Sequence, residues 1–212
     1  MTASTIITVT TGFLAGWALW SLAEYLLHRF AMHHLHGKGI MSREHLEHHV
    51  TSSWHFDRNH ILSWTGMLLV GAVLWAPLGT WAVSLPFGVT AAVGWAFGYF
   101  FYEYQHMAAH RRAPRNTYER SVRSHHFHHH FGHPMANHGV SIAVWDHVFG
   151  TYERPDRVRG PLILVLSWRV DDSGALKPEY HGQYELVGDG RSDERTAALD
   201  RARAFASAAP VD

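Results

Sequence analysis

Cysteine is absent from the 212 residues, so the chain has no disulfide, no thiolate zinc site and no cysteine-ligated iron–sulfur cluster. Any metal bound by this protein must therefore be held by imidazole or carboxylate groups. The chain also lacks net charge, because 18 basic residues balance 18 acidic ones. A balanced charge gives no reason to expect a nucleic-acid partner, and we predict none.

Charged residues are missing altogether from two long stretches, residues 1–23 and 61–102. The second stretch has 42 residues. As a helix rising about 1.5 Å per residue it would span roughly 63 Å, twice the ~30 Å thickness of bilayer hydrocarbon. We therefore expect it to cross a membrane twice, with Pro77, Gly79 and Pro86 at the turn. The sequence predicts three transmembrane helices, near residues 5–27, 61–77 and 86–105.

Tryptophans lie within or beside these segments, and several are near the segment ends. This placement is typical of the aromatic belts found at the two surfaces of a membrane. The six residues are Trp17, Trp20, Trp64, Trp75, Trp81 and Trp95.

The basic residues predict the orientation in the membrane. Arg29 is the first basic residue of the chain, and none occurs between Arg58 and Arg111. With three crossings, every lysine and arginine falls on one side, which the positive-inside rule assigns to the cytoplasm. We expect an external N-terminus and a cytoplasmic C-terminal part. A cleaved signal peptide is the alternative for residues 1–23, but this segment has no basic start.

Histidine is unusually abundant, with 20 residues. Many of them fall into four groups whose spacings suit a metal: an i, i+5 pair, an i, i+4 pair and two triplets in which positions i, i+3 and i+4 share one helix face. The ten candidate ligands are His28, His33, His45, His48, His49, His106, His110, His126, His129 and His130.

Ten imidazoles exceed the needs of one ion, whereas two ions would have about five each. Five nitrogens suit an octahedral transition metal with one open position, and iron is compatible with such ligands. One spacing is awkward, because residues i and i+5 lie about 140° apart on a regular α-helix. His28 and His33 are therefore expected to converge only if the helix ends between them. His34 and His125 are the alternatives to His33 and His126 in their groups.

Carboxylates are expected to support these ligands rather than to join them. Glu103 precedes His106 by three residues, as in some di-iron bundles, but this pair occurs only once. We predict that Glu24 and Glu103 accept the second ring proton of nearby imidazoles. The zinc-protease motif His-Glu-x-x-His is absent.

The order of the four groups resembles the fatty acid hydroxylase/sterol desaturase superfamily over roughly residues 10–153. The matching motifs are His28-x4-His33, His45-x2-His48-His49, His106-x3-His110 and His126-x2-His129-His130. The segments Asn137-His138-Gly139 and Trp145-Asp146-x2-Phe149-Gly150-Thr151-Tyr152 resemble the end of the family's pattern, although an aromatic residue is commoner than His138.

This resemblance implies a cytoplasmic centre of two iron ions that uses O2 to hydroxylate or desaturate a lipid, with zinc as a substitute metal in a purified sample. The substrate would be a fatty acyl chain, a sterol or a related isoprenoid taken from the bilayer. Electrons would come from a separate donor, such as a reductase, a ferredoxin or a cytochrome b5-like carrier, because neither a dinucleotide fingerprint nor a cytochrome b5 haem loop occurs. An acidic carrier could dock on five arginines: Arg111, Arg112, Arg115, Arg120 and Arg123. Contact with anionic lipid headgroups is the alternative.

Three other functions stay open at this point. Carotenoid hydroxylases have similar histidine groups. A metal store or transporter would also bind ions, but polar residues are expected within its crossings. A bis-histidine haem protein needs only two of the ten ligands.

The expected fold is an all-α integral membrane protein with a cytoplasmic, helical, histidine-rich metal domain. Three crossings are predicted, or four as in many relatives if part of the polar region enters the membrane interface. Residues 1–153 would form the oxygenase domain and residues 154–212 a cytoplasmic extension without assigned function. Within that extension the apolar run 162–166 is too short to cross and should pack on the metal domain or the interface. A surface helix is predicted from Ser192 to about Ala209.

Overall fold

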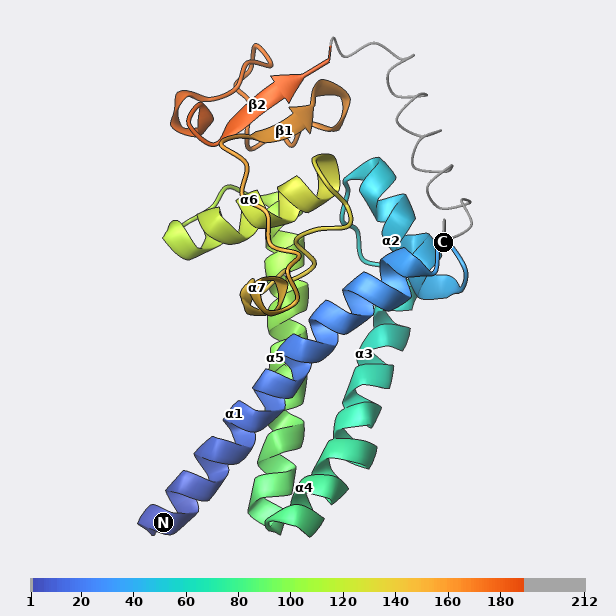
Figure 1. Ribbon diagram of the computed structural model, residues 1–212, viewed down its shortest axis with the longest axis vertical. Helices are drawn as coiled ribbons and strands as arrows, with labels where there is room; N and C mark the ends of the chain where they lie inside the picture. The colour runs from blue at the N-terminus through green and yellow to red at the C-terminus, as the bar shows by residue number, and fades with distance from the viewer. Residues whose placement is uncertain (1, 189–212) are drawn as a thin grey trace. The chain divides into compact units, whose positions relative to one another are not determined.

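A computed structural model describes residues 2–188, so the helix predicted from Ser192 lies outside the described residues. This described part of the chain is mostly helical, with two short strands (Figure 1). The long elements are α1 (Ala3–Leu26), α3 (Arg58–Val70), α5 (Leu85–Arg111) and α6 (Thr117–Phe131). The shorter ones are η1 (Leu27–His34), α2 (Ile40–Thr51), η2 (Gly71–Trp75), α4 (Ala76–Ala82), α7 (Val144–Val148), β1 (Val158–Pro161), η3 (Leu162–Leu164), η4 (Pro178–Tyr180) and β2 (Tyr184–Val187).

The chain divides into two compact units. The first, which we call the apolar unit, contains Met1–Glu24 and His55–Tyr104. The second, the histidine unit, contains Tyr25–Trp54 and the chain from Gln105 onward. The functional division at residue 153 stays a prediction.

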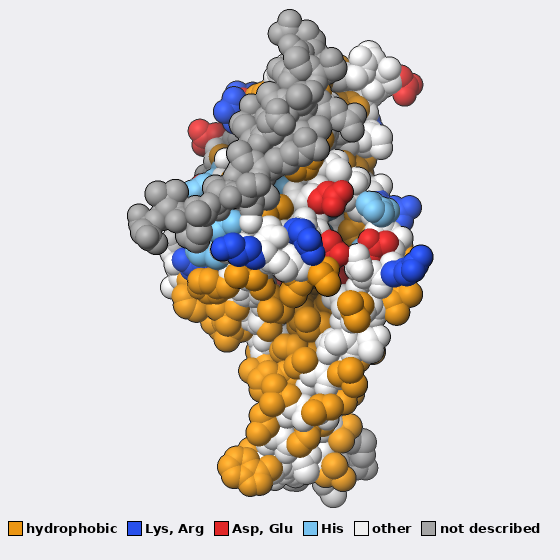
Figure 2. Space-filling model, turned by 90° about the vertical axis from the view of Figure 1, so that its right-hand side faces the viewer, with side chains coloured by type: hydrophobic (Ala, Val, Ile, Leu, Met, Phe, Trp, Pro, Cys, Tyr) orange, Lys and Arg blue, Asp and Glu red, His pale blue; other side chains and the backbone are white. Residues whose placement is uncertain are grey.

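Among residues 2–188, three helices are long and apolar enough to cross a membrane: Ala3–His34, Arg58–Ala82 and Leu85–Arg111. The predicted number of three is confirmed, and these helices indicate an integral membrane protein. Hydrophobic side chains cover most of the long-helix surface seen in Figure 2. The exposed fraction reaches 86% for Trp81 and 71% for Val73. Such exposure of large apolar groups is expected where lipid, rather than water, surrounds the helix.

The turn between the second and third spans lies at Val83 and Ser84, within the predicted interval between residues 77 and 86, but the second span ends later than predicted, at Ala82. Pro77 and Gly79 do not stop the helix. The reason is the π-helical turn η2 just before Pro77, in which Ala76 donates to the carbonyl of Gly71, five residues back. A π turn shifts the hydrogen-bonding partners at the point where proline would otherwise clash with the preceding turn. Pro86 is placed as expected, in the first turn of α5.

Within the apolar unit, α1 and α5 approach closely through glycines. Gly12 and Gly16 on α1, and Gly94 and Gly98 on α5, each form a small-x3-small motif. A Cβ atom on Gly16 would overlap the carbonyl of Ala91, and one on Gly94 would overlap the carbonyl of Phe13. The absence of side chains at these positions therefore sets the distance between the two helices.

The aromatic-belt prediction is wrong for two of the six tryptophans. Trp20 and Trp95 are buried against each other, with ring centroids 5.2 Å apart and planes at 84°. Trp95 also donates from Nε1 to the carbonyl of Met67 at 2.9 Å, which links α5 to α3. Neither residue lies at a lipid surface, because large flat indole rings also fill a helix interface well.

The histidine unit combines η1, α2, the end of α5 and α6 with a small C-terminal layer. In that layer β1 and β2 pair in parallel, with Val158 opposite Tyr184. Its buried residues pack on α6 and the end of α5 in one cluster that includes Ala109, Phe127 and Trp168. Trp168 donates from Nε1 to the carbonyl of Ala109 at 3.1 Å. Leu166, the last residue of the apolar run 162–166, packs against this cluster. This agrees with the first of the two alternatives for that run, packing on the metal domain.

Candidate metal centre

All ten predicted ligands lie in the histidine unit, where they form two groups of five. Within each group, one ring nitrogen per residue lies within 4.8 Å of all the others. Cluster one contains His28, His33, His45, His49 and His129. Cluster two contains His48, His106, His110, His126 and His130. The structure therefore brings together every residue of the predicted set and adds no further one to either cluster among the residues it describes.

Each triplet is divided between the two clusters by helix geometry. On α2, His45 and His49 belong to cluster one, whereas His48 belongs to cluster two. On α6 the division is reversed, since the i and i+4 positions belong to cluster two and His129 belongs to cluster one. Residues i and i+4 are one turn apart and reach the same point, while i+3 is displaced around the axis. Each cluster thus takes two nitrogens from one triplet, one from the other and two from a pair.

His28 and His33 converge in a different way from the one predicted. The first helix does not end between them but continues as the π-helix η1. Because a π-helix joins residues i and i+5 through its hydrogen bonds, residues five apart lie about one turn apart on the same face. The i, i+5 spacing in η1 therefore places His28 and His33 on one helix face, just as the i, i+4 spacing places His106 and His110 on one face of α5.

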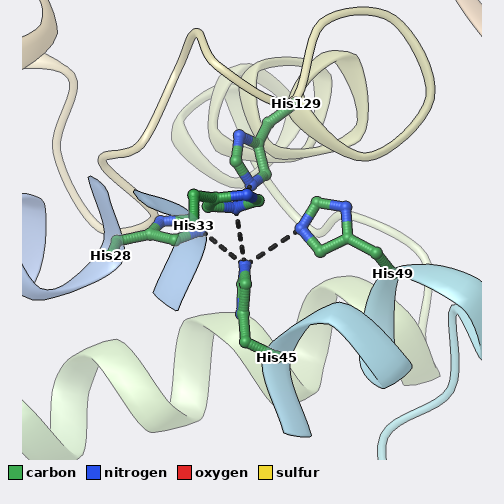
Figure 3. Close-up of side chains that lie close together, drawn as sticks. All are labelled: His28, His33, His45, His49 and His129. Atoms are coloured by element: carbon green, nitrogen blue, oxygen red, sulfur yellow. Dashed lines mark hydrogen bonds between the residues drawn. The ribbon is translucent and has the colours of Figure 1, made fainter. Parts of the chain in front are cut away.

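Cluster one is centred on the Nε2 atom of His45 (Figure 3). This atom lies 3.0 Å from Nε2 of His28, 2.8 Å from Nε2 of His33 and 3.0 Å from Nε2 of His49. A further distance of 3.0 Å joins Nε2 of His33 to Nε2 of His129. Figure 3 shows the five rings pointing toward one another from η1, α2 and α6.

Cluster two has the same kind of geometry. Nε2 of His106 lies 2.9 Å from Nε2 of His48, and Nε2 of His110 lies 2.9 Å from Nε2 of His126. The ring of His130 is within 5.0 Å of the His110 ring and 4.5 Å of the His126 ring, centroid to centroid. Three separate helices, α2, α5 and α6, supply these side chains.

Backbone carbonyls orient several of the rings through their second nitrogen. Nδ1 of His129 bonds to Ala136 O at 2.7 Å, Nδ1 of His48 to Ser53 O at 2.7 Å, and Nδ1 of His110 to Ser52 O at 3.0 Å. Nδ1 of His28 bonds to the carbonyl of His138. A carbonyl can only accept, so Nδ1 carries the proton and Nε2 keeps the lone pair that a metal requires.

Carbonyls, and not carboxylates, accept from Nδ1 of these four rings. The supporting roles of Glu24 and Glu103 stay predictions, and Glu103 accepts a hydrogen bond from the Tyr99 hydroxyl at 2.9 Å. Within a helix most backbone carbonyls already accept hydrogen bonds from the backbone, whereas the carbonyls of the loops after α2 and α6 can accept from the histidine rings. The acceptors therefore come from loop residues, which act through their backbone and not through their side chains.

Asp146 holds the loop that supplies two of these carbonyls. The buried carboxylate accepts from the backbone of His138 at 2.8 Å and Gly139 at 2.9 Å, and from the Thr151 hydroxyl at 2.8 Å. It also bonds Nε2 of His125 at 3.0 Å, which ties the loop to α6. Burial raises the pKa of Asp146, but the hydrogen bonds outweigh this and keep it below its usual value.

Five of the clustered histidines outside the membrane-spanning helices favour the uncharged form. Burial, followed by repulsion from neighbouring imidazoles, holds the pKa of His45, His49, His126, His129 and His130 well below the usual value. Neutral imidazole is the form that binds a metal.

The donor set fits metal ions better than it fits hydrogen bonds. Nε2 of His45 faces three other Nε2 atoms, and a single ring nitrogen cannot form three such bonds. His130 is buried with neither ring nitrogen hydrogen-bonded to any described residue. Two nitrogens bound at about 2.1 Å and at right angles to each other lie about 3.0 Å apart, which matches the contacts of both clusters. Two buried five-histidine clusters are thus able to hold metal ions.

The histidines left out of the predicted ligand set lie elsewhere, with one exception. His34 bonds the carbonyl of Arg29, His125 bonds Asp146, and His128 and His133 both bond Glu153. The alternatives His34 and His125 are therefore outside the clusters. The exception is His138, which is fully buried beside cluster one. The part played by Asp146 was not predicted, although its Trp-Asp motif had been singled out.

Comparison with known proteins agrees with this geometry. The sequence pattern of the fatty acid hydroxylase family matches residues 13–151, more than half of the chain. The chain belongs to this family. All ten clustered histidines fall within the matched residues. No solved structure matches the chain significantly.

Several curated relatives are hydroxylases of this family. Human fatty acid 2-hydroxylase is 30% identical over 151 residues, which cover 66% of this chain and 38% of the relative. The ceramide very long chain fatty acid hydroxylase scs7 of Schizosaccharomyces pombe is 29% identical over 147 residues, covering 66% and 42%. The dihydroceramide fatty acyl 2-hydroxylase FAH2 of Arabidopsis thaliana is 30% identical over 140 residues, covering 62% and 56%. The match to the first two spans about two fifths of their length.

Proposed function

We propose that this protein is a membrane-bound, O2-dependent di-iron hydroxylase that acts on the fatty acyl chain of a lipid. The observation that carries the proposal is the convergence of ten histidines on two adjacent five-nitrogen sites. An all-nitrogen set of five leaves a sixth, octahedral position free for a small co-substrate, which suits iron. Zinc is the expected substitute in a purified sample.

Within this proposal, the two five-histidine sites would hold the ions and supply the activation of O2 needed to oxidise an unactivated C–H bond. The carbonyls at positions 52, 53, 136 and 138 fix the ligand rings, and Asp146 fixes the loop that carries two of them. Burial of most of the rings would keep bulk water from the ions. The protein's own contribution is therefore orientation, exclusion of water and control of which ring nitrogen carries a proton.

A lipid substrate would enter from the bilayer. His28 and His33 lie in the first apolar span, and His106 and His110 lie at the end of the third. An acyl chain could reach the histidines along these helices without passing through water. We propose that these helix ends, and with them the C-terminal part of the chain, face the cytoplasm, as the distribution of lysine and arginine favours.

A separate carrier would deliver the electrons. Of the five arginines considered for docking it, Arg123 is excluded because it is only 1% exposed. Arg112 is also engaged, since it forms an ion pair with Glu119 at 2.7 Å. Arg111, Arg115 and Arg120 are exposed and stay available either to an acidic carrier or to anionic lipid headgroups.

The chemistry predicts a product that can be measured. Hydroxylation consumes one O2, two electrons and two protons and forms an alcohol and one water, whereas desaturation forms an alkene and two waters. The relatives named above are hydroxylases, which favours the alcohol. We suggest reconstituting the chain in lipid nanodiscs with iron, a ferredoxin and its reductase, fatty acyl lipids and 18O2, followed by mass spectrometry of the acyl chains.

An acyl alcohol that carries one 18O supports the proposal, and an unlabelled alkene assigns the protein to desaturation. Iron binding without oxygen consumption would identify a metal store. A Soret absorption band would identify a haem protein. A carotenoid hydroxylase would label added carotenoid but leave the acyl chains unchanged. A His45→Ala variant, which lacks the central ligand of cluster one, is the negative control.

A further inference from the structure

His138 is a buried imidazole without a hydrogen-bonding role in the described structure. Its exposed fraction is 0%, and neither Nδ1 nor Nε2 has a hydrogen-bond partner among the described residues. The nearest carboxylate oxygen, on Asp146, lies 3.9 Å from Nδ1, which is too far for a hydrogen bond. Leaving a buried polar atom unpaired costs about 1–3 kcal/mol. A hydrocarbon ring of similar size would fill the same space without that cost.

The ring of His138 stands among the ligands of cluster one. Its centroid is 5.5 Å from that of His28, 5.8 Å from that of His33 and 5.6 Å from that of His129. Ring pairs inside cluster one are separated by 4.4 Å, for His28 and His129, to 6.1 Å, for His45 and His129. His138 is therefore as close to three ligands as some ligands are to each other.

The backbone on either side of this ring is fixed. The amide of His138 donates to Asp146 at 2.8 Å, and its carbonyl accepts from Nδ1 of His28. Asn137, the preceding residue, adopts a left-handed conformation with φ of 58° and bonds the backbone of Glu153 in both directions. Only the side-chain torsions of His138 remain free to move its ring nitrogens. The rings around it are those of three ligands of cluster one and that of Tyr25, whose centroid is 5.6 Å away.

We infer that His138 is a sixth imidazole donor for the ion in cluster one. This inference rests on the proposed metal centre. It makes the two sites unequal, because cluster one would then offer six nitrogens and cluster two only five. The ion in cluster two would keep the open position, and the ion in cluster one would be closed to small exogenous ligands.

The competing explanation is a purely structural one, in which ordered water satisfies the two nitrogens of His138. The two explanations differ in their response to His138→Phe. Without metal, both allow the variant to be as stable as the wild type or more stable. With metal, only a ligand role predicts weaker binding of one ion per chain.

The test uses purified full-length protein loaded with Co(II), whose visible absorption is stronger in five-coordinate than in six-coordinate sites. We expect His138→Phe to increase this absorption and to release one of two ions at least ten times faster to a chelator, with the second ion unchanged. His147→Phe is the matched control, because it removes an exposed imidazole from the same region. Thermal unfolding of the metal-free proteins shows whether both variants fold.

A second variant makes the result independent of the phenyl ring. In His138→Ala, added imidazole should restore slow release, and in His147→Ala it should have no effect. Identical spectra and release rates for wild type and His138→Phe would overturn the inference while leaving the metal centre intact. A wild-type protein that binds no ion would instead contradict the proposed function.

Discussion

The rings of His49 and His130 are stacked, with centroids 4.1 Å apart and planes at 7°. His49 belongs to cluster one and His130 to cluster two, so this pair lies where the two clusters meet. The stack comes from facing positions on α2 and α6, the two helices that each supply ligands to both clusters. Two ions held in these clusters would therefore be direct neighbours, as a binuclear centre requires.

The division of each triplet predicts different losses for two double variants on the same helix. His45→Ala with His49→Ala removes two ligands of cluster one and should leave about one ion per chain. His45→Ala with His48→Ala removes one ligand from each cluster and should lower the affinity for each of the two ions by at least ten-fold. Metal content measured by mass spectrometry after dialysis distinguishes the two patterns. Equal losses in both variants would show that the clusters do not bind separate ions.

Asp146→Asn should weaken metal binding although Asp146 touches no ion. The carboxylate accepts four hydrogen bonds, two of them from backbone amides of the loop that orients His28 and His129. We expect about 2–3 kcal/mol lower stability and about ten- to hundred-fold weaker metal binding. Calorimetry and chelator competition measure these effects. Asp156→Asn, at an exposed position close by, should have no effect on either quantity.

The metal-free protein should lose stability as the pH falls below about 6.5. The pKa of His45, His49, His126, His129 and His130 is lowered in the folded state, so only the unfolded state takes up protons there. Full stability is therefore present above the unfolded pKa and declines below it, by up to about 1.4 kcal/mol per pH unit for each histidine.

Melting temperatures between pH 7.5 and pH 5.5 test this expectation. A bound metal opposes protonation, so the loaded protein should show a smaller decline until the ions are released. A metal-free melting temperature that stays constant over this range would contradict burial of the five neutral rings.

Glycines at the α1–α5 contact should not tolerate even alanine. In Gly16→Ala and Gly94→Ala the new methyl group would overlap a backbone carbonyl of the facing helix. We expect destabilisation of about 1–3 kcal/mol, measured by thermal unfolding in detergent. Gly66→Ala provides a control of opposite sign, because no atom lies within 4 Å of the added methyl group and alanine favours helix by up to about 1 kcal/mol. Equal changes in stability at the three positions would contradict close packing of α1 against α5.

Trp168→Phe, a change in the C-terminal layer, should lower the stability of the histidine unit. The change removes the hydrogen bond from the indole to Ala109, the residue before His110, and should cost about 1 kcal/mol. Denaturant unfolding measures this cost. Trp81→Phe, at a position that is 86% exposed, should change the unfolding free energy far less.

The sequence predicted well which ten histidines gather, because their spacing is a local property. Positions i and i+4, or i+3, lie on known faces of a helix before any tertiary contact forms. The three apolar spans followed in the same way from length and lack of charge. The sequence was less informative about His28 and His33, because a π-helical turn leaves no distinct residue pattern and a regular helix was assumed.

Residues that act through their backbone escaped prediction for a related reason. The carbonyls of Ser52, Ser53 and Ala136 orient ligand rings, but any residue type offers a carbonyl. Trp20 and Trp95 were misplaced because the same indole suits a membrane surface and a helix interface, and only the facing glycine positions and Met67 decide between them.

By itself, the sequence determined which ten imidazoles are available to bind metal, the absence of thiolates and the three apolar segments long enough to cross a membrane. The tertiary structure alone decided how the ten divide into two sites, because each triplet sends one ring to the opposite cluster. It also decided that loop carbonyls set the ring tautomers and that His138 lies beside cluster one. Those relationships join residues up to 110 positions apart, and periodicity along one helix carries no information about such distances.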